Sequence, residues 1–377
     1  MKKTVMEKLG VSPSLLGFGC MRFPETPEGK IDREKATPML EAAYDAGVTY
    51  FDTAYVYHNG ESEAFLGDVL SKKPRSSYFI ATKLPVSWIE KEEDVLRIFN
   101  EQLLRLKTDH IDFYLLHAVN GNNWKEKILK FNIIEKCVKL KQEGKIRFLG
   151  FSFHDKYEIF KSILTYRDWD FCQIQYNYMD IDLQAGDKGY RLTKKLGVPL
   201  VVMEPVKGGS LANLPADASR PFRELRPDDS DAKWALRWVA NHNNVKVILS
   251  GMSTIEQVRE NLKTFSEFKP MCNRQKHAVR LVREALRARV KNGCTGCSYC
   301  MPCPSGVNIP GIFRTWNNFG IYGNVKDTVN RRNELKSKNT YSDKCVACGR
   351  CEKLCPQHIN IIESLQTAKN ELDSLDQ

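Results

Sequence analysis

Short apolar runs alternate with longer amphipathic segments along the first 270 residues of the chain. The short runs are rich in β-branched and aromatic residues, and the longer segments carry apolar residues at helical spacing. This alternation is typical of βα units that build a parallel sheet. The runs expected to form strands are residues 15–19, 48–52, 78–83, 111–117, 146–152, 171–176, 198–203 and 245–251. Eight such strands predict an α/β fold, a closed (β/α)8 TIM barrel.

The first amphipathic segment carries clear helix boundary signals. Asp32 stands just before the stretch REKATPMLEAAYDAG, where its carboxylate is placed to cap the first turn. Gly47 follows at the other end, where glycine commonly terminates a helix. We therefore expect a helix between the first two strands.

Polar residues and glycines gather at one end of these strands. In a (β/α)8 barrel the carboxyl ends of all strands meet at one face, where active sites lie, and the loops after strands seven and eight often hold phosphate. In strand order the positions are Asp52, Lys83, His117, Ser152, Gln175, then Lys207-Gly208-Gly209 and Gly251-Met252-Ser253. Any one of them has an ordinary structural explanation, but their joint placement predicts a functional site.

Eight of the 12 cysteines fall in two tight runs near the end of the chain, which favours metal binding over disulfides. Each run ends in Cys-Pro. In each run the first three cysteines are separated by two residues, so they can supply three of the four thiolates that an iron–sulfur cluster needs. The runs are Cys294, Cys297, Cys300 and Cys303, and Cys345, Cys348, Cys351 and Cys355. Two [4Fe–4S] clusters are the prediction; a pair of structural zinc sites is the alternative.

The second run resembles those of bacterial two-cluster ferredoxins, whereas the first has two residues where those proteins have three before the last cysteine. In such ferredoxins each run lends its last cysteine to the other cluster. The resemblance implies that Cys303 joins the second run's first three cysteines and that Cys355 joins those of the first. The segment between the runs reads as helical, so we expect a smaller, mainly α-helical ferredoxin-like domain.

These patterns divide the chain into three parts. Residues 1–270 are expected to form the barrel, 271–293 a basic helical connector, and 294–377 the ferredoxin-like domain. The connector is interpreted as a solvated helix face, with docking of an acidic electron carrier such as a ferredoxin or flavodoxin as the alternative.

Composition and net charge indicate where the protein acts and which partners it can bind. The mean hydropathy is −0.43 and no apolar stretch reaches the ~18 residues of a membrane helix. Two lysines follow Met1 without the apolar run of a secretory signal, so we expect a soluble, cytoplasmic protein without a membrane partner. A net charge of +11 would suit nucleic acid, an acidic protein or an anionic cofactor. Of these we expect no nucleic acid.

The sequence resembles the aldo-keto reductase family over about residues 5–265. FDTAYVYHNGESEAFLG is similar to its strand-two motif, IATK to strand three and YLLH to strand four, while QIQYN and SGMSTIEQVREN are similar to the sixth and eighth strand-end motifs. The whole chain resembles the iron–sulfur branch found in anaerobes. The resemblance implies a catalytic tetrad of Asp52, Tyr57, Lys83 and His117.

The tetrad suits carbonyl reduction, which requires a hydride at carbon and a proton at oxygen. A tyrosine such as Tyr57 supplies the proton if a nearby cation, here Lys83, lowers its pKa from about 10. Asp52 would orient the lysine, and His117 would hydrogen-bond the substrate oxygen. Tyr55, two residues earlier on the same turn, is an alternative donor.

The positions that hold nicotinamide in the family depart from its pattern. Ser152 is followed by Phe153 instead of asparagine, and Met203 replaces a tyrosine that stacks on the ring. The basic residues that pair with the 2′-phosphate of NADP are replaced by Gly251, Ser253 and Gln257. The resemblance and the barrel end together assign cofactor contacts to Ser152, Gln175, Met203, Lys207, Gly208, Gly209, Gly251, Ser253, Thr254, Gln257 and Asn261.

The cofactor in the barrel is therefore either a flavin, FMN, or NAD(P)H. A [4Fe–4S] cluster moves single electrons and nicotinamide moves a hydride, whereas a flavin exchanges both. Three functions are compatible with these features. In the first, the chain is a reductase of a carbonyl or activated double bond of a small molecule, with electrons passing between the clusters and the barrel cofactor. The alternatives are a conventional NAD(P)H-dependent aldo-keto reductase with structural clusters and a non-enzymatic electron-transfer protein.

Overall fold

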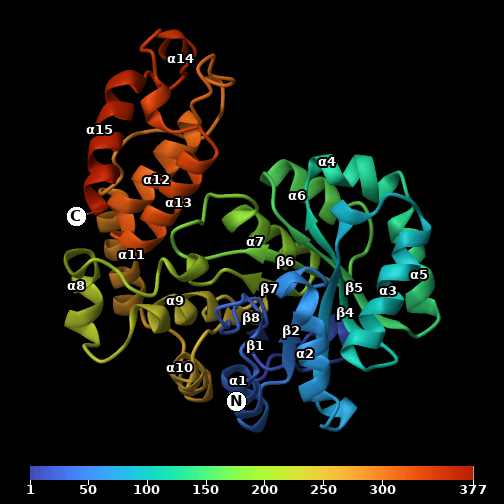
Figure 1. Cartoon of the computed structure of the whole chain (residues 1–377). Helices are drawn as coiled ribbons and strands as arrows, with labels where there is room; N and C mark the ends of the chain where they lie inside the picture. The colour runs from blue at the N-terminus through green and yellow to red at the C-terminus, as the bar shows by residue number, and fades with distance from the viewer. Residues whose placement is uncertain (377) are drawn as a thin grey trace. The chain divides into compact units, whose positions relative to one another are not determined.

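The computed structural model describes residues 1–376, and its first part is a closed barrel of eight parallel strands (Figure 1). Neighbours in sequence are neighbours in the sheet, and the last strand closes the barrel by pairing with the first through Leu16–Ile248 and Gly19–Gly251. The strands are β1 Leu16–Gly19, β2 Tyr50–Asp52, β3 Phe79–Leu84, β4 Ile111–Val119, β5 Ile146–Phe153, β6 Phe171–Gln175, β7 Leu200–Met203 and β8 Val245–Gly251. All eight predicted strands and the barrel are confirmed.

Helices connect the strands and surround the sheet (Figure 1). They are α1 Arg33–Asp45, α2 Glu61–Leu70, α3 Glu93–Leu106, α4 Gly121–Asn123, α5 Ile133–Gln142, α6 Tyr157–Leu164, α7 Gly186–Leu196, α9 Asp231–Ala240 and α10 Ile255–Ser266. Helix α8, Ala216–Leu225, follows β7 in the sequence but belongs to the second compact unit. Asp32 caps α1 by accepting a hydrogen bond from the Lys35 N–H at 3.2 Å, as expected. Gly47 follows with φ +87°, a conformation that glycine adopts without strain.

The barrel interior is filled by side chains from alternate strand positions. Tyr50, Phe113 and Phe171 form its aromatic centre, with ring centroids 4.9 Å apart for Tyr50–Phe113 and 5.1 Å for Phe113–Phe171. Gly17 leaves room for this packing, because a Cβ at that position would lie 2.6 Å from Val247 Cγ1. The interior is therefore a packed core below the functional face.

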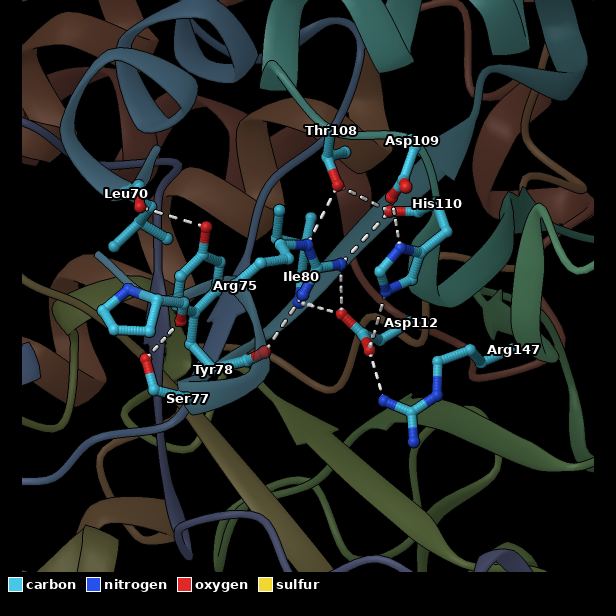
Figure 2. Close-up of polar contacts among 11 residues, drawn as sticks. Leu70, Arg75, Ser77, Tyr78, Ile80, Thr108, Asp109, His110, Asp112 and Arg147 are labelled. Carbon is cyan, nitrogen blue, oxygen red and sulfur yellow. Dashed lines mark hydrogen bonds and ion pairs between the residues drawn. The ribbon is translucent and has the colours of Figure 1, made fainter. Parts of the chain in front are cut away.

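A buried carboxylate ties three strands together at the amino-terminal end of the barrel. Figure 2 shows Asp112 between Arg75 and Arg147. Asp112 Oδ2 accepts from Arg75 Nη2 at 2.6 Å and from the Ile80 N–H at 2.9 Å, while Oδ1 accepts from Arg147 Nη1 at 2.6 Å. The Asp112 side chain is fully buried. Since these groups come from the starts of β3, β4 and β5, the cluster fixes that edge of the barrel.

The chain divides into two compact units. The first comprises Met1–Gly208 and Ala232–Cys272, and the second comprises Gly209–Asp231 and the chain from Asn273 onward. The second unit thus includes the α8 segment from between β7 and β8, which the expected division at residue 270 assigned to the barrel. The boundaries 1–270, 271–293 and 294–377 remain a prediction.

Every regular element described from Asn273 onward is helical: α11 Asn273–Arg287, α12 Ile309–Tyr322, α13 Val325–Ser337, α14 Arg350–Lys353 and α15 Ile361–Asp373, with short 3-10 turns. The helical segment expected between the cysteine runs is α12 and α13. Ile312, Phe313 and Leu365 lie at the centre of this unit's own apolar core. Among residues 1–376, no helix has both the length and the apolar character needed to cross a bilayer.

Candidate active site

Three of the four tetrad residues form one buried contact group. The Lys83 ammonium, at the end of β3, donates to Asp52 Oδ1 at 2.6 Å and to the Thr53 carbonyl at 2.7 Å. It also lies 3.3 Å from the Tyr57 hydroxyl. Lys83 is fully buried, and Asp52 is nearly so. The strand-end argument therefore placed Asp52 and Lys83 together correctly, and Tyr57, which the resemblance supplied, joins them.

His117 completes the group from β4. Its ring packs edge-on against Tyr57, with centroids 5.9 Å apart and an interplanar angle of 77°. The next residue, Ala118, has φ +52°, an unusual left-handed conformation for a residue with a side chain. The Ser152 hydroxyl accepts a hydrogen bond from the Ala118 N–H at 2.8 Å and so supports this turn. Such local strain commonly marks functional sites, where the surrounding structure holds it in place.

Burial dominates the electrostatics of the group. Burial raises the pKa of Tyr57 above its ordinary value, although the Lys83 charge opposes the shift. Burial would lower the pKa of Lys83, but Asp52 and Tyr57 outweigh it and the net shift is upward. The expected lowering of the Tyr57 pKa is wrong for this arrangement, because the sequence argument considered the cation and not the loss of water. Tyr57 is held as a neutral phenol beside a charged ammonium.

Burial first, and then the Lys83 charge, lowers the pKa of His117 to about 3. The imidazole is therefore neutral at physiological pH. In that state it offers one N–H donor to a substrate oxygen without competing with Tyr57 as an acid.

A buried polar network that the sequence reasoning missed supports Lys83. Glu63, on α2, accepts from Thr82 Oγ1 at 2.6 Å and from Gln102 Nε2 at 2.7 Å. Gln102 Nε2 also donates to the Lys83 carbonyl at 3.1 Å. Glu63 is completely buried beside Phe65 and Leu66. A glutamate at the buried position of an amphipathic helix was the signal that could have revealed it.

The two cysteine runs line two cavities in the second unit. One cavity is lined by Cys294, Cys297, Cys300 and Cys355 among other residues. The other is lined by Cys303, Cys345, Cys348 and Cys351, and Cys300 lines this cavity as well. The last cysteine of each run thus lies with the first three of the other, as cross-ligation requires.

The donor set fits two [4Fe–4S] clusters, because the lining of each cavity includes the four thiols that cross-ligation assigns to it. No group of three or more His, Cys, Asp or Glu side chains within residues 1–376 is placed to hold a single metal ion. A cluster sets a different requirement, since each thiolate binds a different iron atom.

The comparisons with known proteins agree with this geometry. Residues 15–275 match the model of the aldo/keto reductase family. The chain belongs to the aldo/keto reductase family. Residues 293–360 match the 4Fe–4S dicluster domain. The chain is therefore an oxidoreductase with a reductase barrel and an iron–sulfur domain.

Two curated relatives align with most of the barrel. The uncharacterized oxidoreductase YqkF of Bacillus subtilis is 27% identical, and the alignment covers 68% of this chain and 89% of that protein. The NADH-specific methylglyoxal reductase of Escherichia coli is also 27% identical, with coverage of 70% and 93%. Among solved structures, the holo form of an aldo-keto reductase from Bacillus halodurans has a TM-score of 0.63 and 28% identity, covering 75% of this chain and 96% of its own.

Tyr55, the alternative proton donor, lies in a different environment from Tyr57. Its hydroxyl donates to Glu101 Oε2 at 2.5 Å, and burial, then this hydrogen bond, raises its pKa. Its ring meets Trp88 edge-on at 5.6 Å. Trp88, which the sequence reasoning did not single out, follows β3 and is 57% exposed, so it offers an apolar face beside the reductase site. Within the described chain, only Tyr57 of these two tyrosines has a hydrogen bond to Lys83.

Several side chains expected to hold the cofactor are already bonded within the protein. The amide of Gln175 donates to Asp180 Oδ2 at 2.7 Å and accepts from Gln184 at 3.2 Å. The Lys207 ammonium contacts both oxygens of Asp180 at 2.7 Å. Because Asp180 lies in the loop after β6, no strand-end pattern pointed to it. Gln175 and Lys207 thus form one network at this face.

The predicted contacts after β8 organise the turn into α10. The Ser253 N–H donates to Gln257 Oε1 at 2.8 Å, and Thr254 caps the helix by accepting from the Gln257 N–H at 3.3 Å. Asn261 donates to the buried hydroxyl of Ser250 at 3.0 Å. Gly209 belongs to the second unit. The cofactor roles of these residues remain predictions.

One further group on β6 suits a ring cofactor. Gln173 Nε2 lies 3.3 Å from the sulfur of Met203. Its Oε1 is a buried acceptor without a hydrogen-bond partner in the part of the chain described. A buried unpaired acceptor is costly unless a ligand or water satisfies it. The ring N–H of a flavin or the carboxamide of nicotinamide would do so, and the residues present therefore fit either cofactor.

Proposed function

We propose that this protein reduces a carbonyl group or an activated carbon–carbon double bond of a small organic molecule, with electrons passing between two [4Fe–4S] clusters and a cofactor in the barrel. The observation that carries the proposal is the Lys83–Tyr57 contact at 3.3 Å, in a chain whose cysteines line two four-thiol cavities. The first supports proton delivery, and the second supports single-electron transfer.

Within this proposal each tetrad residue has one task. Tyr57 donates its phenolic proton to the substrate oxygen as hydride reaches the carbon, and the resulting phenolate is stabilised by the adjacent Lys83 ammonium. Asp52 keeps Lys83 charged and oriented through the 2.6 Å ion pair. Neutral His117 donates a hydrogen bond that orients the substrate oxygen and stabilises its developing charge.

For the barrel cofactor we favour FMN, held by the residues around Met203, Gln173 and the ends of β7 and β8. When bound, a flavin supplies a hydride and accepts electrons singly, which a cluster requires. Met203 supports this choice, because it stands where the family usually has a tyrosine that stacks on nicotinamide. The Gln175 amide donates one N–H to Asp180 and accepts from Gln184, so it keeps one N–H for a ligand and does not discriminate between the two cofactors.

A second candidate is a conventional NADH-dependent reductase with structural clusters. It is supported by the alignment with a protein named NADH-specific methylglyoxal reductase. Gly251, Ser253 and Gln257 supply no positive charge for a 2′-phosphate, so NADPH is the least suited form. A purely electron-transferring protein would have no need for a buried Lys83–Asp52 pair beside a tyrosine.

We further propose that an acidic ferredoxin or flavodoxin exchanges electrons with the iron–sulfur domain, in the cytoplasm of an anaerobe. Helix α11 exposes Arg274, Lys276, Arg280 and Arg287, which would complement an acidic carrier. Such complementarity increases the rate of encounter and is weakened by salt.

Acid precipitation of the anaerobically purified protein, followed by analysis of the supernatant, distinguishes the two cofactors. The proposal predicts FMN approaching one molecule per chain. A supernatant without flavin, together with tight NADH binding and NADH-driven turnover, would refute the flavin and favour the conventional reductase.

A further inference from the structure

Arg22, in the loop after β1, lies against two glycines, Gly208 in the turn after β7 and Gly251 at the end of β8. Its Nη2 atom is 3.5 Å from the position that a Cβ on Gly208 would occupy. Its side-chain stem is closer still to Gly251, where a Cβ would lie 3.2 Å from Arg22 Cγ. The guanidinium therefore reaches the barrel end where phosphate groups are commonly held.

The backbone of Arg22 is fixed, while its charged group has no protein partner. The Ser253 hydroxyl donates to the Arg22 carbonyl at 2.9 Å, and Ser253 is itself held through Gln257. Within residues 1–376 the guanidinium makes no ion pair or hydrogen bond, and the side chain is exposed. An anchored arginine with a free guanidinium is suited to bidentate binding of an anion.

The other cation of this region, Lys207, is already paired with a carboxylate. Both oxygens of Asp180 contact its ammonium at 2.7 Å, so a carboxylate already balances its charge. Arg22 is consequently the better source of positive charge for a ligand at the ends of β1, β7 and β8.

The contact with Arg22 explains why a glycine stands at position 251. A side chain there would press on the Arg22 stem, because 3.2 Å is tighter than an ordinary carbon contact. Gly251 stands where the family pattern has a basic residue for the NADP phosphate, so its lack of a side chain removes one cation and makes room for another. The absence of a side chain at Gly251 thus lets Arg22 extend past the end of β8.

We propose that Arg22 binds a phosphate group of the barrel cofactor, either the phosphate of FMN or the pyrophosphate of NADH. This inference rests on the proposed function, which places a nucleotide cofactor in the barrel. It adds a specificity residue from a loop that the sequence motifs did not include, and it assigns Lys207 to the Asp180 network.

The test compares each phosphate-bearing cofactor with a phosphate-free counterpart. Equilibrium dialysis of the anaerobic full-length protein measures Kd for FMN against riboflavin, and for NADH against dihydronicotinamide riboside. The variants are Arg22→Gln, Arg22→Lys and the control Arg220→Gln, which removes an exposed arginine from α8. Iron content and circular dichroism confirm that each variant is folded.

Loss of a charge-assisted hydrogen bond predicts that Arg22→Gln weakens binding of the phosphate-bearing cofactor about 10- to 100-fold. Binding of the phosphate-free counterpart to Arg22→Gln, and of the cofactor to Arg220→Gln, should be unchanged, and Arg22→Lys should recover part of the loss. The cofactor pair that responds identifies the source of the phosphate. Unchanged FMN and NADH affinity in Arg22→Gln, or an equal loss with the phosphate-free compounds, would overturn the assignment to Arg22. If the wild-type protein binds neither cofactor, the proposed function fails and the assignment fails with it.

Discussion

The Lys83 ammonium, which is fully buried, lies 3.3 Å from the hydroxyl of the half-buried Tyr57. The buried Asp52 carboxylate holds the ammonium in place, so the cation is already positioned before a phenolate forms. Preorganisation of this kind stabilises the charge that develops in the transition state without reorganisation during the reaction.

Replacing Tyr57 with phenylalanine should abolish carbonyl reduction, because phenylalanine has no hydroxyl to donate a proton to the substrate oxygen. The ring is kept, so the fold should not change. Methylglyoxal, named in one relative's activity, is a suitable first substrate for the assay. Iron content and the thermal unfolding midpoint should match the wild-type values. Tyr55→Phe is the matched control and should retain activity, since the Tyr55 hydroxyl is bonded to Glu101. Full activity in Tyr57→Phe would show that the tetrad is not used.

Replacing Lys83 with methionine should reduce activity strongly and move any alkaline limb of the rate profile to higher pH. The protonated phenol is the active acid, and the Lys83 charge lowers the Tyr57 pKa against the effect of burial. Removing that charge therefore raises the pKa further. Rate profiles of the two proteins measure the shift, and a limb that moves to lower pH would contradict the arrangement.

The double variant Lys83→Met/Asp52→Asn should be more stable than Lys83→Met alone, because it leaves no unpaired buried carboxylate.

His117 should contribute no titration near its ordinary pKa of about 6.5. Burial and the Lys83 charge lower its pKa to about 3, so the neutral imidazole persists as pH falls through the usual histidine range. The rate profile of the wild-type protein should accordingly lack a limb in that range that depends on His117. An acidic limb near 6.5 that disappears in His117→Gln would show that the imidazole is instead solvated and charged.

The iron–sulfur domain should contain roughly eight irons and eight acid-labile sulfides per chain. Cys348→Ser should remove about half of the iron. The cavity linings further predict that Cys303→Ser perturbs the same cluster as Cys348→Ser, whereas Cys355→Ser perturbs the other. Iron and sulfide analysis with electron paramagnetic resonance of each reduced variant tests this pairing. Zinc alone in an anaerobic preparation, or Cys303→Ser matching a Cys294→Ser spectrum, would contradict it.

The buried cluster around Asp112 should be structural. Asp112→Asn should lower the free energy of unfolding by roughly 2–4 kcal/mol, because it leaves two arginines facing a weaker acceptor. Asp109→Asn is a control on the same loop, where the carboxylate is 85% exposed, and its effect should stay within about 0.5 kcal/mol. Denaturant unfolding measures both. Comparable stability losses in the two variants would mean that the Asp112 contacts are not maintained in solution.

Local patterns were sufficient to predict the strands and the meeting of Asp52, Lys83 and His117, because strand ends in a closed barrel must meet, while the resemblance supplied Tyr57. They did not predict the direction of the Tyr57 pKa shift, which depends on how far the folded chain buries its hydroxyl. Nor did they predict the Gln175 and Lys207 contacts with Asp180, since these depend on the path of a loop and on side-chain rotamers. Arg22 escaped notice for the same reason: its neighbours Gly208 and Gly251 are about two hundred residues away in sequence.

The central claim is that the clusters and the barrel act as one redox system, and reoxidation of the clusters tests it most directly. The FMN-supplemented protein is reduced anaerobically, excess reductant is removed, and cluster absorbance is followed after adding methylglyoxal. We predict reoxidation with one product molecule formed per two electrons in the wild-type protein, and no substrate-dependent reoxidation in Tyr57→Phe. Clusters that stay reduced in the wild-type protein while NADH alone supports turnover would contradict the claim.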